Sequence, residues 1–167
     1  LGYVEGRQLL PRGLFALEVH VQELLVTELL FSGILQEAEP AEAAAILAGV
    51  DYRPGRDEYV VGGKYNLKAV GALRRSLLKS GVPEQLCVWS SMPGPLATAW
   101  YEGATFEELL EMTSLEEGDI FSLLRREIDL LRQIERAAFN IGDTGLRRMA
   151  EEMRRALDRD EVALLGI

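Results

Sequence analysis

The segment that most constrains the fold is residues 117–141, EGDIFSLLRREIDLLRQIERAAFNI, which reads as one long helix. At about 100° per residue it separates into two arcs, and beyond the first turn Glu127 and Glu135 are the only charges in the wider, apolar arc. A helix that is apolar over about two-thirds of its circumference is expected inside a bundle, with one strip left open. The polar strip, about 120° wide, consists of Ser122, Arg125, Arg126, Asp129, Arg132, Gln133 and Arg136.

Helical periodicity covers most of the remaining sequence. Further helices are expected at about 21–31, 40–49, 66–80, 90–103, 105–112 and 144–159. Residues 51–63 hold glycines, a proline and charges and are predicted to form a connecting loop, with at most a short extended piece at 59–61. Two capping boxes are predicted, Thr105 with Glu108 and Ser114 with Glu117.

These patterns predict an all-α fold, a helical bundle of about seven to eight helices with a long central helix. At 167 residues the chain has the length of one domain. It begins at Leu1 without a methionine, so we expect residues 1–167 to be a single helical-bundle domain excised from a larger protein.

The charge distribution is uneven. The formal net charge is −9, which argues against a protein that wraps nucleic acid through a broad positive field. Residues 51–100 and 121–160 nevertheless carry small positive balances, whereas residues 101–120 carry −7. An anionic partner would therefore meet the two positive segments.

No catalytic, cofactor or metal site is expected in this domain. His20 is the only histidine and Cys87 the only cysteine, too few for a metal-binding set or a nucleophile with its base. No intrachain disulfide is possible. No signal peptide is visible, and no apolar run approaches the roughly 18 residues of a membrane span, so we expect a cytoplasmic protein with no membrane partner.

The arginines of the polar strip allow two interpretations. In the first they form an ordinary solvated face, with Asp129 paired to Arg125 or Arg132. In the second they line a nucleic-acid path, because a guanidinium group holds phosphate oxygens bidentately and stacks on unpaired bases. Composition alone does not decide between them.

A longer tract adds to this reading. Residues 100–146, beginning WYEGATFEELLEM, contain Trp100, Gly103, Thr105 and Phe106, followed by Glu117-Gly118, the arginine pair and a leucine-rich run. Upstream, GLFALEV and ELLVTELLFSGIL lie within residues 13–35 in the matching order. The chain thereby resembles the C-terminal helical (DSHCT) domain of exosome-associated DExH-box RNA helicases: the superkiller (antiviral) helicase, its nuclear relatives and their bacterial counterparts.

The resemblance implies a domain that packs on two motor domains of the same chain and guides single-stranded RNA along a ratchet helix. That helix carries an arginine and, three residues later, an acidic residue, both of which face the RNA; Arg126 and Asp129 hold these positions. Asp129 replaces the commoner glutamate, and Glu127 replaces a leucine. The nucleic-acid-binding residues expected on this basis are Arg125, Arg126, Asp129, Arg132, Gln133 and Arg136.

The whole protein would then be an ATP-dependent RNA helicase that acts in RNA unwinding, processing or decay. ATP and Mg²⁺ would bind in its motor domains, and RNA-degradation machinery would be a partner. One alternative is a non-catalytic helical protein–protein docking module whose acidic segments meet a basic partner. A third reading, a helix-turn-helix DNA reader built on residues 105–112 and the next helix, fits the acidic first helix poorly.

Overall fold

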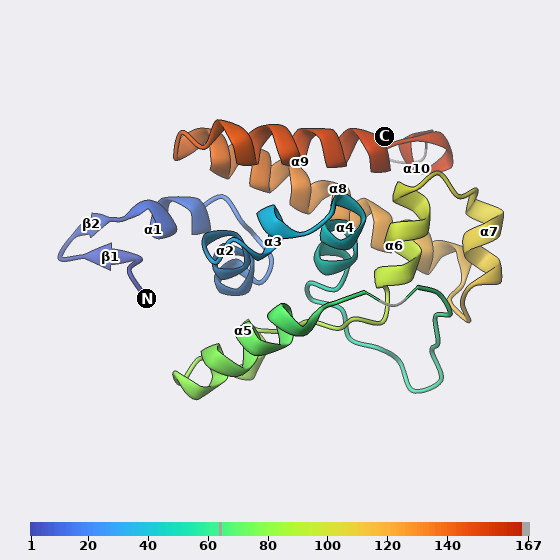
Figure 1. Cartoon of the computed structure of the whole chain (residues 1–167), viewed down its shortest axis with the longest axis horizontal. Helices are drawn as coiled ribbons and strands as arrows, with labels where there is room; N and C mark the ends of the chain where they lie inside the picture. The colour runs from blue at the N-terminus through green and yellow to red at the C-terminus, as the bar shows by residue number, and fades with distance from the viewer. Residues whose placement is uncertain (64, 165–167) are drawn as a thin grey trace.

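The computed structural model describes residues 1–63 and 65–164, and it confirms the predicted all-α architecture (Figure 1). Its described helices are α1 (Pro11–Ala16), α2 (Glu23–Phe31), α3 (Ile34–Glu37), α4 (Pro40–Ala48), α5 (Lys68–Lys79), α6 (Gly94–Tyr101), α7 (Phe106–Glu111), α8 (Glu117–Asn140), α9 (Thr144–Leu157) and α10 (Asp160–Leu164). The sequence predicted fewer, because α1, α3 and α10 span only 6, 4 and 5 residues, too few for periodicity to show.

The described residues also include two features that the sequence reading missed. Strands β1 (Val4–Glu5) and β2 (Gln8–Leu9) pair as a small antiparallel hairpin, and a 3-10 turn, η1, spans Glu84–Leu86. Two residues per strand are too few for an alternating pattern. The hairpin projects from the body of the bundle beside the N-terminus (Figure 1).

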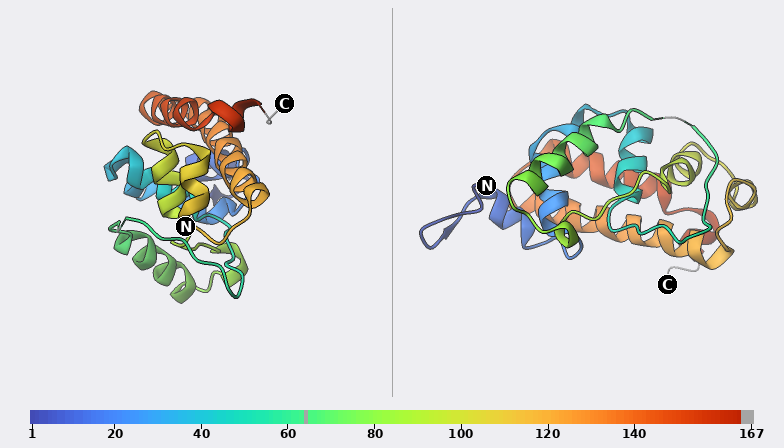
Figure 2. Two further views of the ribbon diagram at one scale, coloured as in Figure 1. Left: turned by 90° about the vertical axis from the view of Figure 1, so that its right-hand side faces the viewer. Right: turned by 90° about the horizontal axis from the view of Figure 1, so that it is seen from below.

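The predicted long central helix is α8, and the other elements are arranged around it. α9 follows α8 after a short turn and packs back along it, which makes these two helices the most extensive contact in the described fold. α4 packs against α6 and also contacts α8. α5 contacts α2 and lies on the opposite side of the molecule from α9 (Figures 1 and 2).

One hydrophobic core joins these elements, and Trp100 is its largest fully buried side chain. Its indole Nε1–H donates a hydrogen bond to the Leu157 carbonyl at 2.7 Å, which ties α6 to the end of α9. The Phe106 ring packs edge-on against it at 6.1 Å between centroids, and the guanidinium of Arg159 covers its face at 3.6 Å. These contacts fix where the C-terminal end of α9 lies relative to α6 and α7.

One predicted capping box is confirmed and the other is wrong. The Thr105 hydroxyl accepts a hydrogen bond from the Glu108 amide at 3.2 Å, and the Glu108 carboxylate accepts one from the Thr105 amide at 2.8 Å. α8, however, begins after Glu116, whose partner is Asp119. Ser114 instead accepts a hydrogen bond from the Tyr59 amide at 2.9 Å.

The Ser114 contact is one of several hydrogen bonds that join the predicted 51–63 loop to the α7–α8 connection. Val60 forms an isolated antiparallel bridge with Thr113, and the Val61 amide donates to the Met112 carbonyl at 2.7 Å. The short extended piece expected at 59–61 is therefore present, paired with the α7–α8 connection. No described helix is both long and apolar enough to cross a membrane.

Candidate nucleic-acid interface

All six residues predicted to contact nucleic acid lie on α8, but the fold gives them different surroundings. α8 is positioned by the Glu116–Asp119 box at its start and by α9 along its length. Buried apolar side chains from Ile120 to Ala138 hold its wide face in the core. The polar strip therefore stays at the surface, and its members differ in what they touch.

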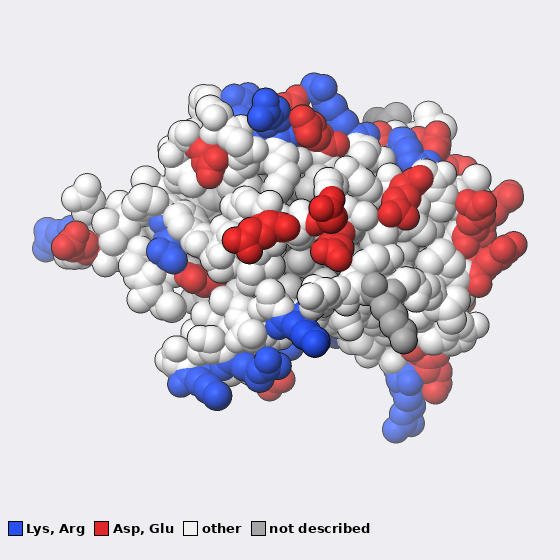
Figure 3. Space-filling model, in the orientation of Figure 1, with Lys and Arg blue, Asp and Glu red and all other residues white. Residues whose placement is uncertain are grey.

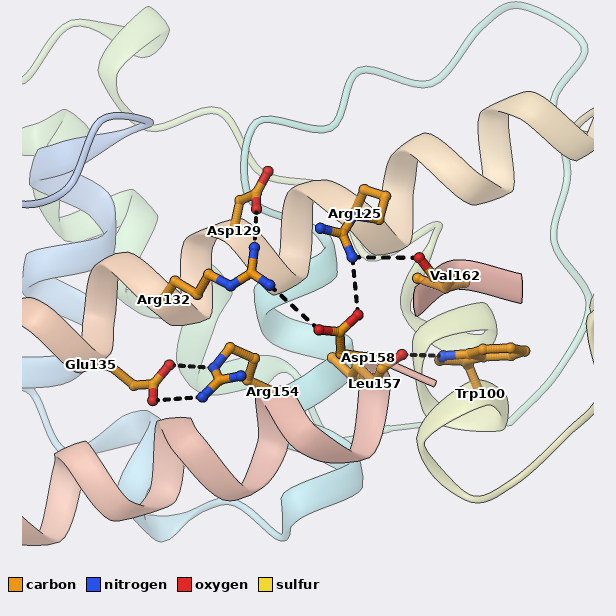
Figure 4. A network of polar contacts seen from close by, with 9 residues as sticks. All are labelled: Trp100, Arg125, Asp129, Arg132, Glu135, Arg154, Leu157, Asp158 and Val162. Carbon is orange, nitrogen blue, oxygen red and sulfur yellow. Dashed lines mark hydrogen bonds and ion pairs between the residues drawn. The ribbon is translucent and has the colours of Figure 1, made fainter. Parts of the chain in front are cut away.

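Arg125 and Arg132 are tied to the end of α9 by one carboxylate (Figure 4). The Asp158 carboxylate accepts from Arg125 at 3.0 Å and from Arg132 at 3.4 Å. Arg125 also donates to the Val162 carbonyl at 3.4 Å, and its side chain is only 15% exposed. The guanidinium of Arg125 is thus engaged inside the fold, where it fastens α9 and α10 to α8.

Arg126, the next residue, is exposed and forms no ion pair within the part of the chain that the structure describes. It stands between two hollows of about 220 and 320 Å³ and contributes to the lining of both. Tyr52 lines the larger one, where burial and its hydrogen bond to Glu58 raise the pKa of the Tyr52 hydroxyl to about 12. The positive charge of Arg126 acts on that pKa in the opposite direction. The guanidinium of Arg126 can therefore bind an anion that enters either hollow.

Asp129 and Gln133 line the smaller hollow together with Arg126. The Asp129 carboxylate is exposed and pairs with Arg132 at 3.2 Å. The Gln133 side-chain oxygen accepts a hydrogen bond from the His20 amide at 2.8 Å, so this residue also anchors the segment that precedes α2. Arg136 is exposed one turn further on, at a separate hollow between α8 and α9.

The two charges in the apolar arc of α8 behave differently. Glu135 pairs with Arg154 of α9 through two hydrogen bonds, at 2.6 and 3.2 Å (Figure 4). Glu127 is only 2% exposed, and neither of its carboxyl oxygens has a hydrogen-bond partner among the described residues. Burial without a partner raises the pKa of Glu127 well above its ordinary value of 4.5, which favours the neutral acid.

Sequence reasoning passed over two residues near Arg136. Phe139 is 65% exposed near the end of α8, and the Arg147 guanidinium lies 5.0 Å from the centre of its ring. Phe139 follows the periodic part of α8, and Arg147 belongs to the next helix, so the helical wheel of α8 gave no signal for the pair.

Figure 3 shows basic side chains over α9 and α5 and an acidic group over α7. Within the described residues, no cluster of three or more His, Cys, Asp or Glu could hold a metal ion.

The profile of the DSHCT (NUC185) domain matches residues 6–164, almost the whole chain. The chain belongs to the DSHCT domain family. Several RNA helicases are similar to it over most of its length. The ATP-dependent RNA helicase mtr4 of Schizosaccharomyces pombe is 29% identical over 154 residues, which cover 83% of this chain. The human exosome RNA helicase MTR4 is 28% identical over 97% of this chain.

The mouse superkiller complex protein 2 is also 28% identical over 97% of this chain. The chain spans only 14 to 17% of the lengths of these relatives. It is therefore comparable to one part of each of these proteins. This DSHCT domain is related to those of Mtr4- and Ski2-type DExH-box RNA helicases, as the tract at residues 100–146 indicated.

The residues that carry the family resemblance have structural roles in this DSHCT domain. Trp100 and Phe106 pack together in the core, and Thr105 caps α7. Gly103 follows α6 with φ +102°, a conformation that L side chains rarely adopt. These four residues thus build the connection from α6 to α7 that precedes α8, whereas Arg126, further along the tract, is exposed.

Proposed function

We propose that this DSHCT domain is the C-terminal helical domain of an ATP-dependent DExH-box RNA helicase, in which α8 guides single-stranded RNA past the motor domains. The observation that carries the proposal is the guanidinium of Arg126, which forms no ion pair among the described residues and lines two hollows, one of them together with Asp129. The names of the related RNA helicases support it. The domain would contribute strand guidance while hydrolysis takes place elsewhere in the protein.

The division of labour on α8 supports a narrow and weak RNA contact. Arg125 and Arg132 form ion pairs with Asp158 and so stabilise the fold, whereas Arg126 forms no ion pair among the described residues. One or two contacts of about 1–3 kcal/mol each would steer a moving strand without trapping it. A broad basic face would hold the strand too tightly to let it advance.

The remaining components of the proposal concern the whole protein. ATP and Mg²⁺ would bind in motor domains of the same chain, against which the bundle would pack. RNA-degradation machinery would be a further partner, since one relative is named as an exosome helicase and another as a superkiller complex protein. A cytoplasmic location fits the single buried cysteine, because disulfides are rare in reducing compartments.

The test is Arg126→Ala in the full-length protein, with Arg155→Ala as the matched control. Arg155 lies on α9, its side chain is 72% exposed, and it pairs with Glu151 of the same helix. We expect Arg126→Ala to slow RNA unwinding about tenfold, the effect of losing about 1.4 kcal/mol of strand contact, with ATP binding unchanged. The salt dependence of RNA affinity should fall by about 0.7 in log–log slope, the share of one phosphate contact.

Two outcomes would reject this assignment. Unwinding at the wild-type rate in Arg126→Ala would remove the guiding role of α8. An equal loss of unwinding in Arg155→Ala would point to a general effect of charge.

A protein–protein docking module is the alternative function, and the acidic surface over α7 favours it (Figure 3). That surface lies in a segment of net charge −7 and would meet a basic partner.

A further inference from the structure

A hollow of about 610 Å³ lies between α8 and α9, at the end of α8 that is distant from Arg126. It is large enough for an aromatic base together with part of its backbone, since ligand pockets span about 300–1,000 Å³. Four arginines, two glutamates, one asparagine and one phenylalanine line it, so its charge is positive in an acidic protein: Glu18, Arg132, Glu135, Arg136, Phe139, Asn140, Arg147 and Arg154.

Both glutamates of this hollow already have partners. Glu135 accepts two hydrogen bonds from Arg154, and Glu18 accepts one from the side-chain amide of Asn140 at 2.9 Å. Arg136 and Arg147, by contrast, form no ion pair within the described ranges of the chain. Two guanidinium groups are therefore available to an anion at this end of α8.

Phe139 adds an exposed aromatic ring to the hollow that Arg136 and Arg147 also line. The side chain is 65% exposed, and the Arg147 guanidinium lies 5.0 Å from the ring centre. This contact orients the ring and leaves much of its area open. Isolated exposed hydrophobic residues are common and need no explanation. Here, however, the ring lies in a concave, positively charged site with two guanidinium groups that form no ion pair in the described part of the chain.

We propose that this hollow is a second strand-binding site, in which one unstacked RNA base stacks on Phe139 while Arg136 and Arg147 bind the neighbouring phosphates. The inference rests on the proposed function, because the strand would be the one that Arg126 guides. Phe139 follows Arg126 by 13 residues, or about 20 Å along the helix at 1.5 Å per residue. α8 would then contact the strand at two separate points.

The chemistry of the site favours RNA over an acidic peptide. Every base presents a flat π-face, so stacking on an aromatic ring is tolerant of sequence, as strand guidance requires. A guanidinium fork binds phosphate oxygens bidentately. An acidic peptide would use the arginines but would have no need of a planar ring, so substitutions at Phe139 separate the two partners.

The experiment measures the affinity of the full-length protein for fluorescently labelled single-stranded RNA. We expect Phe139→Ala to weaken binding about tenfold, within the range for loss of one base–aromatic stack. Phe139→Tyr should bind like the wild type, because it keeps the ring. Phe139→Leu, which is apolar but not planar, should be as weak as alanine. Tyr59→Ala is the control, since Tyr59 is a similarly exposed aromatic residue, 57% exposed, in the 51–63 loop.

Each outcome decides a specific point. Wild-type affinity in Phe139→Ala, with Arg126→Ala still impaired, would overturn the second site and leave the proposed function standing. Wild-type affinity in Phe139→Leu, with a loss in alanine, would indicate an apolar contact without stacking and would also overturn it. If the wild-type protein bound no single-stranded RNA, the proposed function itself would fail.

Discussion

Replacing Glu127 with glutamine should stabilise the fold, and the gain should grow with pH. The Glu127 carboxyl is buried in α8 without a hydrogen-bond partner among the described residues, and burial raises its pKa well above 4.5. The unfolded chain, in contrast, releases the proton near 4.5. The stability that Glu127 contributes is therefore fully present below about pH 4.5 and is lost as the pH rises toward the folded pKa.

The magnitude follows from proton linkage. For each pH unit between the unfolded and folded pKa values, the free energy of unfolding of the wild type should fall by about 1.36 kcal/mol relative to the Glu127→Gln variant. Above the folded pKa the difference should level off.

The assay is urea unfolding of both proteins at a series of pH values, because urea carries no charge and does not screen ionic contacts. Glu127→Leu serves as the second variant. It places at this position the leucine that the resemblance to the helicase domains implies, and it also removes the buried polar atoms, for a further gain of about 1–3 kcal/mol. The two variants should differ by a constant amount at every pH. A difference between wild type and Glu127→Gln that does not change with pH would refute the reasoning.

Two further substitutions test the contacts that place α9. Asp158→Ala removes the shared partner of Arg125 and Arg132 and should cost about 1–2 kcal/mol, seen as a drop of about 2–8 °C in melting temperature; Glu151→Ala, at an exposed pair, should have almost no effect. Trp100→Phe removes the hydrogen bond to Leu157 and part of a fully buried ring, and should lower the urea midpoint by the equivalent of about 2–3 kcal/mol with an unchanged denaturant slope.

The sequence predicted the elements that depend on local chemistry. The periodicity of α8 and the Thr105–Glu108 box are set by residues a few positions apart, and both are present in the fold. The Ser114 box was wrong because a distant loop competes for that side chain. The Tyr59 amide, 55 residues away in the sequence, donates to Ser114, and the residue that caps α8 is Glu116, two positions after the predicted Ser114, with its own box.

The same limit applies to the candidate interface. On a helical wheel Arg125 and Arg126 belong to one polar strip, and no local property separates them. The fold separates them because Asp158, 33 residues after Arg125, accepts from Arg125 and not from Arg126. Glu127 stood out in the sequence as a charge in an apolar arc, but whether it finds a partner depends on the side chains that other elements bring to it, and no described residue supplies one. Such contacts cannot be read from one helix.

The central claim is that α8 contacts the moving RNA strand, and site-specific crosslinking tests it most directly. The full-length protein would be irradiated with single-stranded RNA containing photoreactive bases, and the crosslinked peptides would be identified by mass spectrometry. We predict crosslinks to peptides that contain Arg126 and Phe139, with the first signal reduced in Arg126→Ala. Crosslinks confined to other elements, with none on α8, would contradict the account.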